Sequence, residues 1–293
     1  MSVAGVFGLF RASPQHPIGA DGRMALADHL RELRARLLRV VAVLVVAVAI
    51  ALIFYDEILT LVYEPYYIAV SEQPGTKTLP TVAGIGGPLL LQLKLSGLVA
   101  IVATCPYWLY QIWAFILPGL HANEKKWTRI FAAVAGPLFI AGVGVAYYVL
   151  PKGLAVLMGF TPADLTNVVD FGDYLSFLTR MLLVFGVAFE IPLFVVLLNL
   201  AGVVSGKTLG AYRPWIVVGT FVFAAIATPS TDPFSMVMLA GPMTLLFFVS
   251  EGIARIVDRR RARRASDEFE DDEPSAIGGP DDVRRSDLVE DED

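Results

Sequence analysis

The sequence predicts an all-α integral membrane protein with six transmembrane helices and both termini on the cytoplasmic side. Of its 293 residues, 56% are apolar, and the mean hydropathy is +0.63. This apolar share exceeds that of soluble domains. The apolar residues gather into membrane-length stretches, and Lys and Arg concentrate in alternate connecting segments. These observations favour a multi-pass membrane protein and argue against a soluble globular one.

The apolar stretches define the expected spans. Four are long enough to cross a bilayer core of about 30 Å as a helix: residues 37–55, 88–109, 131–150 and 174–203. Two shorter stretches, residues 215–228 and 234–250, reach only about 21 and 26 Å at 1.5 Å per residue. The turn between them, residues 229–233, contains two prolines, so we expect the short fifth and sixth spans to form a hairpin.

Most of the 23 Lys and Arg lie before the first span, in every second loop, or after the sixth span. Because positive residues mark the cytoplasmic side, both termini are assigned there. The chain then divides into a flexible cytoplasmic leader, a membrane domain, and a charged, disordered cytoplasmic tail. These regions cover residues 1–25, 26–251 and 252–293. Two long outer loops are expected at residues 56–87 and 151–173, the first with an aromatic-rich interfacial segment.

The residues that enzymes and metal sites need are not grouped in this sequence. Cys105 is the only cysteine and lies in an apolar run, and the three histidines are far apart. This pattern predicts neither a disulfide nor a metal cluster. The motifs of intramembrane metalloproteases and of phosphate-binding loops are missing. The sequence therefore predicts a protein that is not an enzyme and has no cofactor.

Glu190 lies in the middle of the fourth predicted span, two residues before Pro192, which should kink the helix. An intramembrane carboxylate costs free energy and is a candidate functional group by default. It could also be a protonated carboxyl that bonds to a neighbouring helix. A small-solute secondary transporter with Glu190 as its intramembrane site is the alternative function, although such proteins carry several deep polar groups.

Glu32 lies in an amphipathic segment, residues 29–37, that runs directly into the first span. Arg36 follows four residues later, so a solvated ion pair is one interpretation. The other is a cytoplasmic carboxylate that awaits a basic partner. Glu124 lies among basic residues in the loop after the second span, beyond the bend predicted at Pro118.

Four segments together resemble the TatC family, the polytopic subunit of the twin-arginine protein translocase. They are HLRELRARL (29–37), YQIWAFILPGL (110–120) with Glu124, FEIP (189–192) and RPWIVVGTFVFAAIATPSTDPFS (213–235). The resemblance covers about residues 26–251, and the leader and tail look like those of an actinobacterial member.

The resemblance implies a receptor in the bacterial cytoplasmic membrane for twin-arginine signal peptides of folded cargo. It implies partnership with TatA and TatB, self-association in a multi-copy complex, and use of the proton-motive force. No nucleic-acid partner is expected.

The resemblance also assigns roles to single residues. Glu32 and Glu124 match the two carboxylates that bind the paired arginines, and guanidinium forks suit carboxylates better than lysines do. Glu190 matches a carboxylate of the concave membrane face. Supporting roles in recognition or assembly fall on Arg34, Pro65, Phe115, Pro118 and Asp232.

The sequence departs from the family pattern at two positions. Met236 replaces a common glutamine, and Phe248 replaces a common glutamate, with Glu251 one turn later. We transfer no role to either position.

Overall fold

The computed structural model describes residues 26–72, 77–116, 124–162, 166–227 and 233–271. Its elements are α2 (Leu26–Ile53), α3 (Tyr55–Ser71), β1 (Lys77–Thr81), α4 (Gly87–Ala103), α5 (Cys105–Ile116), α6 (Glu124–Gly159), β2 (Thr166–Asp170), α7 (Phe171–Ala188), α8 (Ile191–Leu200), α9 (Gly206–Ala211), α10 (Arg213–Ala227) and α11 (Pro233–Asp271).

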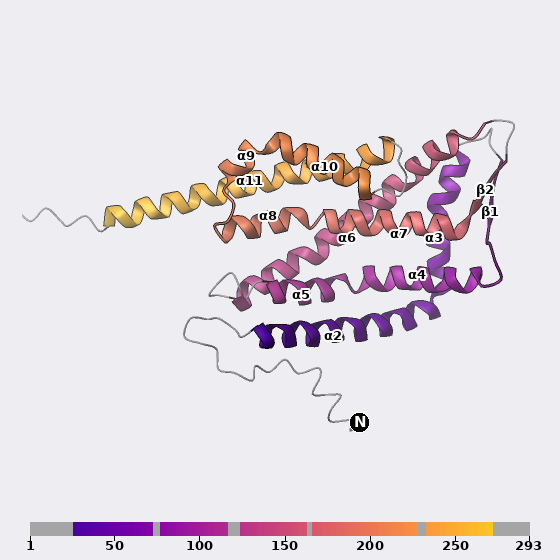
Figure 1. The fold of residues 1–293 in the computed structure, drawn as a ribbon, viewed down its shortest axis with the longest axis horizontal. Coiled ribbons are helices and arrows are strands. Elements are labelled where there is room, and N and C mark those ends of the chain that lie inside the picture. The colour runs from indigo at the N-terminus through magenta and orange to yellow at the C-terminus, as the bar shows by residue number, and fades with distance from the viewer. Residues whose placement is uncertain (1–25, 73–76, 117–123, 163–165, 228–232, 272–293) are drawn as a thin grey trace, which may run out of the picture.

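The long helices run along one axis of the molecule, and α3 crosses them near one end (Figure 1). The strands β1 and β2 also lie at that end, which we call the sheet end. The start of α2, the short helix α9 and the end of α11 lie at the opposite end, which we call the basic end because its helices carry most of the arginines. The first and last described helices thus have their outer ends on the same side of the bundle.

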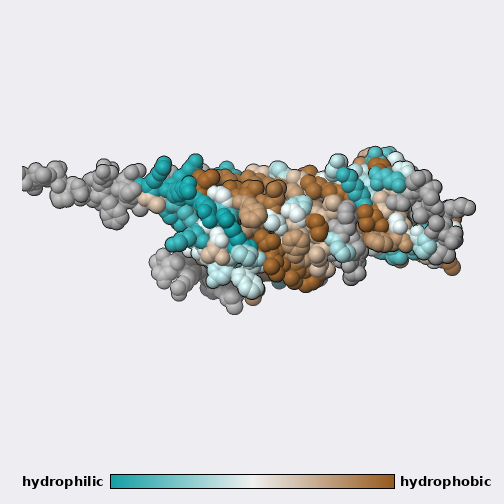
Figure 2. Space-filling view, turned by 90° about the horizontal axis from the view of Figure 1, so that it is seen from above, coloured by the Kyte–Doolittle hydropathy of each residue, from teal (hydrophilic) through white to brown (hydrophobic). Residues whose placement is uncertain are grey.

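In the described part of the chain, four helices are long and apolar enough to cross a membrane, and the bent pair α4–α5 makes a fifth span if it is counted as one. Helix α10 is a shorter apolar helix. Figure 2 shows an apolar belt between two more hydrophilic ends, as expected for a bundle whose middle lies in lipid. The prediction of a helical membrane protein is confirmed, and five of the six predicted spans correspond to these candidates.

The second predicted span is bent rather than continuous. Helices α4 and α5 meet at an angle of 59°. Pro106 has no backbone N–H for a helical bond, which interrupts the ladder near Thr104. The Trp108 indole N–H bonds to the carbonyl of Ile101 at 2.9 Å, so this carbonyl keeps a partner inside the apolar region. The helix then continues to Ile116, past the predicted end at residue 109.

The first half of the first predicted outer loop, including its aromatic-rich segment, is helix α3. Pro65 lies inside this helix and is buried. Its missing N–H would have bonded to the carbonyl of Leu61, four residues earlier. That carbonyl instead accepts a hydrogen bond of 2.8 Å from the hydroxyl of Tyr147 in α6. Tyr174 in α7 donates likewise to Val62 at 2.8 Å. The proline therefore opens a bonding site that ties α3 to the bundle.

Three further expectations are wrong in detail. The strands β1 and β2 pair in parallel, so the chain is not purely α-helical. Helix α6 continues to Gly159, into the expected second outer loop. Helix α11 has 39 residues, so the sixth helix is not short, and residues 252–271 of the expected disordered tail are helical.

Among the described residues, the largest packed core joins α3, α4, α6, α7, α10 and α11. Within it, α6 and α7 approach closely at Gly142. A Cβ atom there would lie 2.6 Å from the carbonyl oxygen of Phe185 and 2.9 Å from the Phe189 ring. Small residues allow such approaches between membrane helices.

We expect Gly142→Ala to destabilise the fold by about 1–3 kcal/mol because the backbone of α7 must move. Gly144→Ala is the matched control, since a Cβ there meets nothing within 4 Å. The control should be neutral or slightly stabilising, as alanine favours helix. Thermal unfolding in detergent measures both, and equal midpoints for the two variants would contradict the close contact.

Candidate functional site

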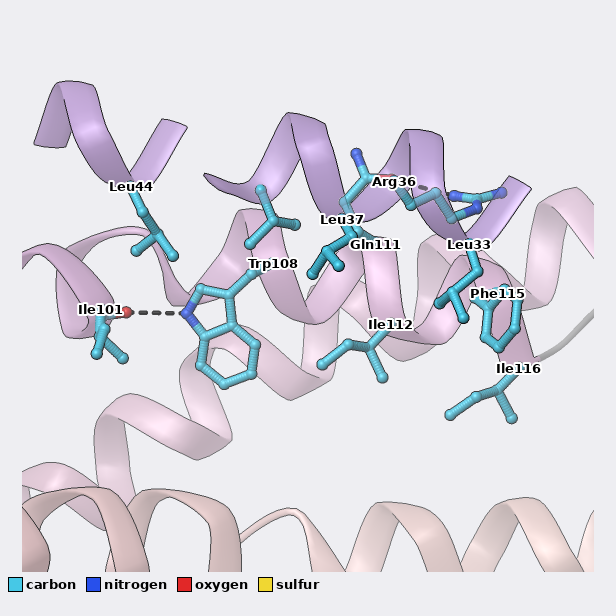
Figure 3. A pocket seen from close by; sticks show the side chains of 11 residues that line it. Leu33, Arg36, Leu37, Leu44, Ile101, Trp108, Gln111, Ile112, Phe115 and Ile116 are labelled. Atoms are coloured by element: carbon cyan, nitrogen blue, oxygen red, sulfur yellow. Dashed lines mark hydrogen bonds between the residues drawn. The ribbon is translucent and has the colours of Figure 1, made fainter. Parts of the chain in front are cut away.

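A groove of about 540 Å³ lies between α2 and the α4–α5 pair (Figure 3). It begins at the basic end near Leu33 and Phe115 and extends toward Leu44 and Ile101. Nine of its eleven lining residues are apolar or aromatic. The lining residues are Leu33, Arg36, Leu37, Val40, Leu44, Ile101, Trp108, Gln111, Ile112, Phe115 and Ile116.

Two leucines of the amphipathic segment, Leu33 and Leu37, line this groove rather than fill a core. Leu33 and Leu37 are 41% and 59% exposed, although their spacing is that of a buried stripe. An apolar stripe that faces a groove is free to contact an apolar ligand.

Glu32 lies next to Leu33, and Arg36 binds it. The guanidinium of Arg36 donates to Glu32 Oε1 through Nε at 2.9 Å and also through Nη2. Its Nη1 donates to Gln111 Oε1 in α5 at 3.1 Å. The predicted ion pair of Glu32 and Arg36 is therefore present, and Gln111 attaches it to the opposite wall of the groove. Sequence spacing could not show this third partner, because Gln111 is 75 residues away.

Two other predicted residues lie at this end of the molecule. Phe115 lines the groove, and its ring stacks on the ring of His29 with centroids 4.3 Å apart. This stack joins α2 to α5. Arg34 is exposed on α2 and does not line the groove.

Glu190 lies at the break between α7 and α8, two residues before Pro192, where the sequence predicts a kink. Both carboxylate oxygens are buried, and neither has a hydrogen-bond partner among the described residues. The indole nitrogen of Trp113 in α5 is also buried without a hydrogen-bond partner among the described residues, and it lies near the Glu190 carboxylate. Glu190 is separate from the groove and from Glu32.

The structure leaves part of the predicted site undescribed. Pro118 and Asp232 lie outside the described residues. Helix α6 begins at Glu124, and its backbone is at the basic end, where α2 also begins.

Sequence reasoning missed one charged cluster. Glu251, left without a role, is 2% exposed and binds two arginines, Arg213 and Arg255. Its position near the predicted membrane boundary was the available signal, because a carboxylate there needs a cationic partner.

The apolar belt and the apolar helices of membrane-spanning length define the class as a multi-pass membrane protein. Residues 28–242 match the family described as Sec-independent protein translocase protein (TatC). The chain is 42% identical over 256 residues to the TatC of Xylanimonas cellulosilytica, covering 87% of this chain and 92% of that protein. It is 39% identical over 272 residues to the TatC of Frankia casuarinae, covering 88% and 74%.

The fold agrees with these similarities. A crystal structure of the twin-arginine translocase receptor TatC in DDM superposes with a TM-score of 0.66 at 31% identity. The match covers 77% of this chain and 99% of the crystallised one. The chain therefore belongs to the TatC family of Sec-independent protein translocase proteins, whose members are translocase components and not enzymes.

Proposed function

We propose that this chain is the signal-peptide receptor of a twin-arginine translocase in the bacterial cytoplasmic membrane. It binds twin-arginine signal peptides on the cytoplasmic side and works with TatA, TatB and further copies of itself. Transport of folded cargo uses the proton-motive force. The proposal includes six spans, with α10 as the short fifth one, and both termini in the cytoplasm.

The observation that carries this proposal is the carboxylate of Glu32 at the mouth of an apolar groove. A twin-arginine signal peptide presents two guanidinium groups next to an apolar stretch. Charge-assisted, bidentate bonds to Glu32 and Glu124 would hold the arginines. The groove between α2 and α5 would then take the apolar stretch, since its lining is almost wholly apolar.

Arg36 forms an ion pair with the carboxylate of Glu32. Both bonds of its fork reach Oε1, so the fork does not use Oε2. An incoming arginine can therefore approach the second oxygen or displace Arg36, which would remain bound to Gln111. The ion pair with Arg36 thus offsets the desolvation penalty of the partly buried Glu32 carboxylate.

The proposal is tested by complementation in bacteria that lack their own TatC and express the cognate TatA and TatB. We expect the wild-type chain to deliver a folded, cofactor-loaded twin-arginine substrate to the periplasm. Glu124→Lys should abolish delivery while the protein still inserts at wild-type levels. Failure of the wild-type chain despite normal insertion, or full export by the variant, would refute the proposal.

A further inference from the structure

A second charged site lies at the basic end, where α9, α10 and α11 meet (Figure 1). The buried carboxylate of Glu251 accepts from Arg213 twice, from Nε to Oε2 and from Nη2 to Oε1, both at 2.6 Å. Arg255 Nη2 lies 2.7 Å from Oε1. One carboxylate thus holds two guanidinium groups, and these three side chains carry a net charge of +1.

The backbone of α9 packs directly against Arg255 at two glycines, Gly206 and Gly210. A Cβ atom at Gly206 would lie 2.7 Å from Cγ of Arg255, and one at Gly210 would overlap the Arg255 guanidinium. One turn along α11, Asp258 accepts from the backbone N–H of Gly206 at 2.7 Å. The position of Arg255 is therefore set by packing as well as by its ion pair.

Both guanidinium groups retain hydrogen-bonding capacity. Each has five N–H donors; Glu251 accepts two hydrogen bonds from Arg213, and one nitrogen of Arg255 forms an ion pair with it. The side chains of Arg213 and Arg255 are 47% and 45% exposed. Two preoriented, half-exposed guanidinium groups with excess positive charge match the oxygens of a phosphate group.

The surroundings place this site at the level of lipid headgroups. Tyr212 and Trp215 flank Arg213 and are 58% and 74% exposed. Such aromatic residues mark the boundary between hydrocarbon and headgroups. Val218, Val222 and Ile226 are exposed further along α10, where acyl chains would lie. The ligand class that places a phosphate at this boundary and apolar chains beside it is a phospholipid.

We propose that Arg213 and Arg255, held by Glu251, bind the phosphate of an anionic phospholipid headgroup at the edge of the apolar belt. Zwitterionic lipids should bind less well because their own ammonium group cancels the phosphate charge. The site is separate from Glu32 and the α2–α5 groove, so its test is independent of signal-peptide binding.

The test is native mass spectrometry of the full chain in detergent, titrated with phosphatidylglycerol or phosphatidylcholine. We expect phosphatidylglycerol to bind about tenfold more tightly, because its headgroup has no ammonium group that offsets the phosphate charge. Arg255→Gln should remove this preference while Arg213 still pairs with Glu251. Arg260→Gln is the matched control, because Arg260 is exposed on the same helix and its loss changes the net charge equally.

Thermal unfolding reports whether Arg255→Gln is folded. If its midpoint falls, Arg255→Lys replaces it, since lysine keeps the charge but loses the fork, and the preference should fall about threefold. Equal loss in the Arg255 and Arg260 variants would overturn the proposal and indicate a diffuse basic surface. Displacement of phosphatidylglycerol by an equal concentration of inorganic phosphate would also overturn it, because the site would then take a free anion.

Discussion

Replacing Glu32 with lysine should weaken binding of a twin-arginine signal peptide by about thirtyfold or more. Removal of one partner from a hydrogen-bonded charge pair costs about 2–5 kcal/mol, and each 1.4 kcal/mol is a factor of ten. The lysine would add repulsion, both toward the peptide and toward Arg36, which now binds Glu32. The measurement is the dissociation constant of a fluorescent signal peptide for the purified full chain.

Glu57→Lys is the matched control for this reversal. Glu57 is exposed in the first turn of α3, at the sheet end, so the change in net charge is the same but the site is remote. The control should bind the peptide within a factor of two of wild type. Glu32→Gln should fall between the two, because the amide accepts hydrogen bonds but carries no charge. Wild-type affinity in Glu32→Lys would remove this residue from the recognition site.

Arg213→Met should cause the largest loss of stability among substitutions at the basic end. It removes both hydrogen bonds from Arg213 to the carboxylate of Glu251, which is 2% exposed, and leaves only the ion pair with Arg255. A buried charge that loses its partner destabilises a fold far more than the intact pair stabilises it. We expect the thermal midpoint in detergent to fall by several degrees.

The double variant Arg213→Met with Glu251→Leu separates charge from packing. It removes the orphaned carboxylate as well as its partner, and apolar replacement of a whole buried pair is often neutral. Most of the lost midpoint should therefore return. If the double variant is no more stable than Arg213→Met alone, an unpaired carboxylate is not the cause of the loss.

Much of the fold could be predicted from the sequence, because apolar stretches of membrane length are a strong signal. The interruption of the helix before Pro192 and the helix that carries Glu32 into the first span followed from local spacing. The bend at Thr104 did not, although Pro106 was visible, because hydropathy averages over a span. The helix α3 was mistaken for a loop since its buried face becomes evident only when it packs on α6 and α7.

The candidate site was less predictable than the fold. A pair four residues apart, such as Glu32 and Arg36, can be read from one helix. Gln111 and the groove wall depend on tertiary packing of α2 against α5, which spacing does not encode. Glu251 was left without a role because its partner Arg213 is 38 residues away, on another helix.

The central claim is that the twin arginines bind at Glu32 while the adjacent apolar stretch lies in the α2–α5 groove. Photocrosslinking tests it most directly, with a signal peptide that carries one photoreactive side chain in its apolar stretch. The account predicts adducts on groove residues such as Leu33, Leu37 and Ile112, and their loss when the peptide arginines are replaced by lysines. Adducts mainly on α10, or groove adducts that persist with the twin-lysine peptide, would contradict it.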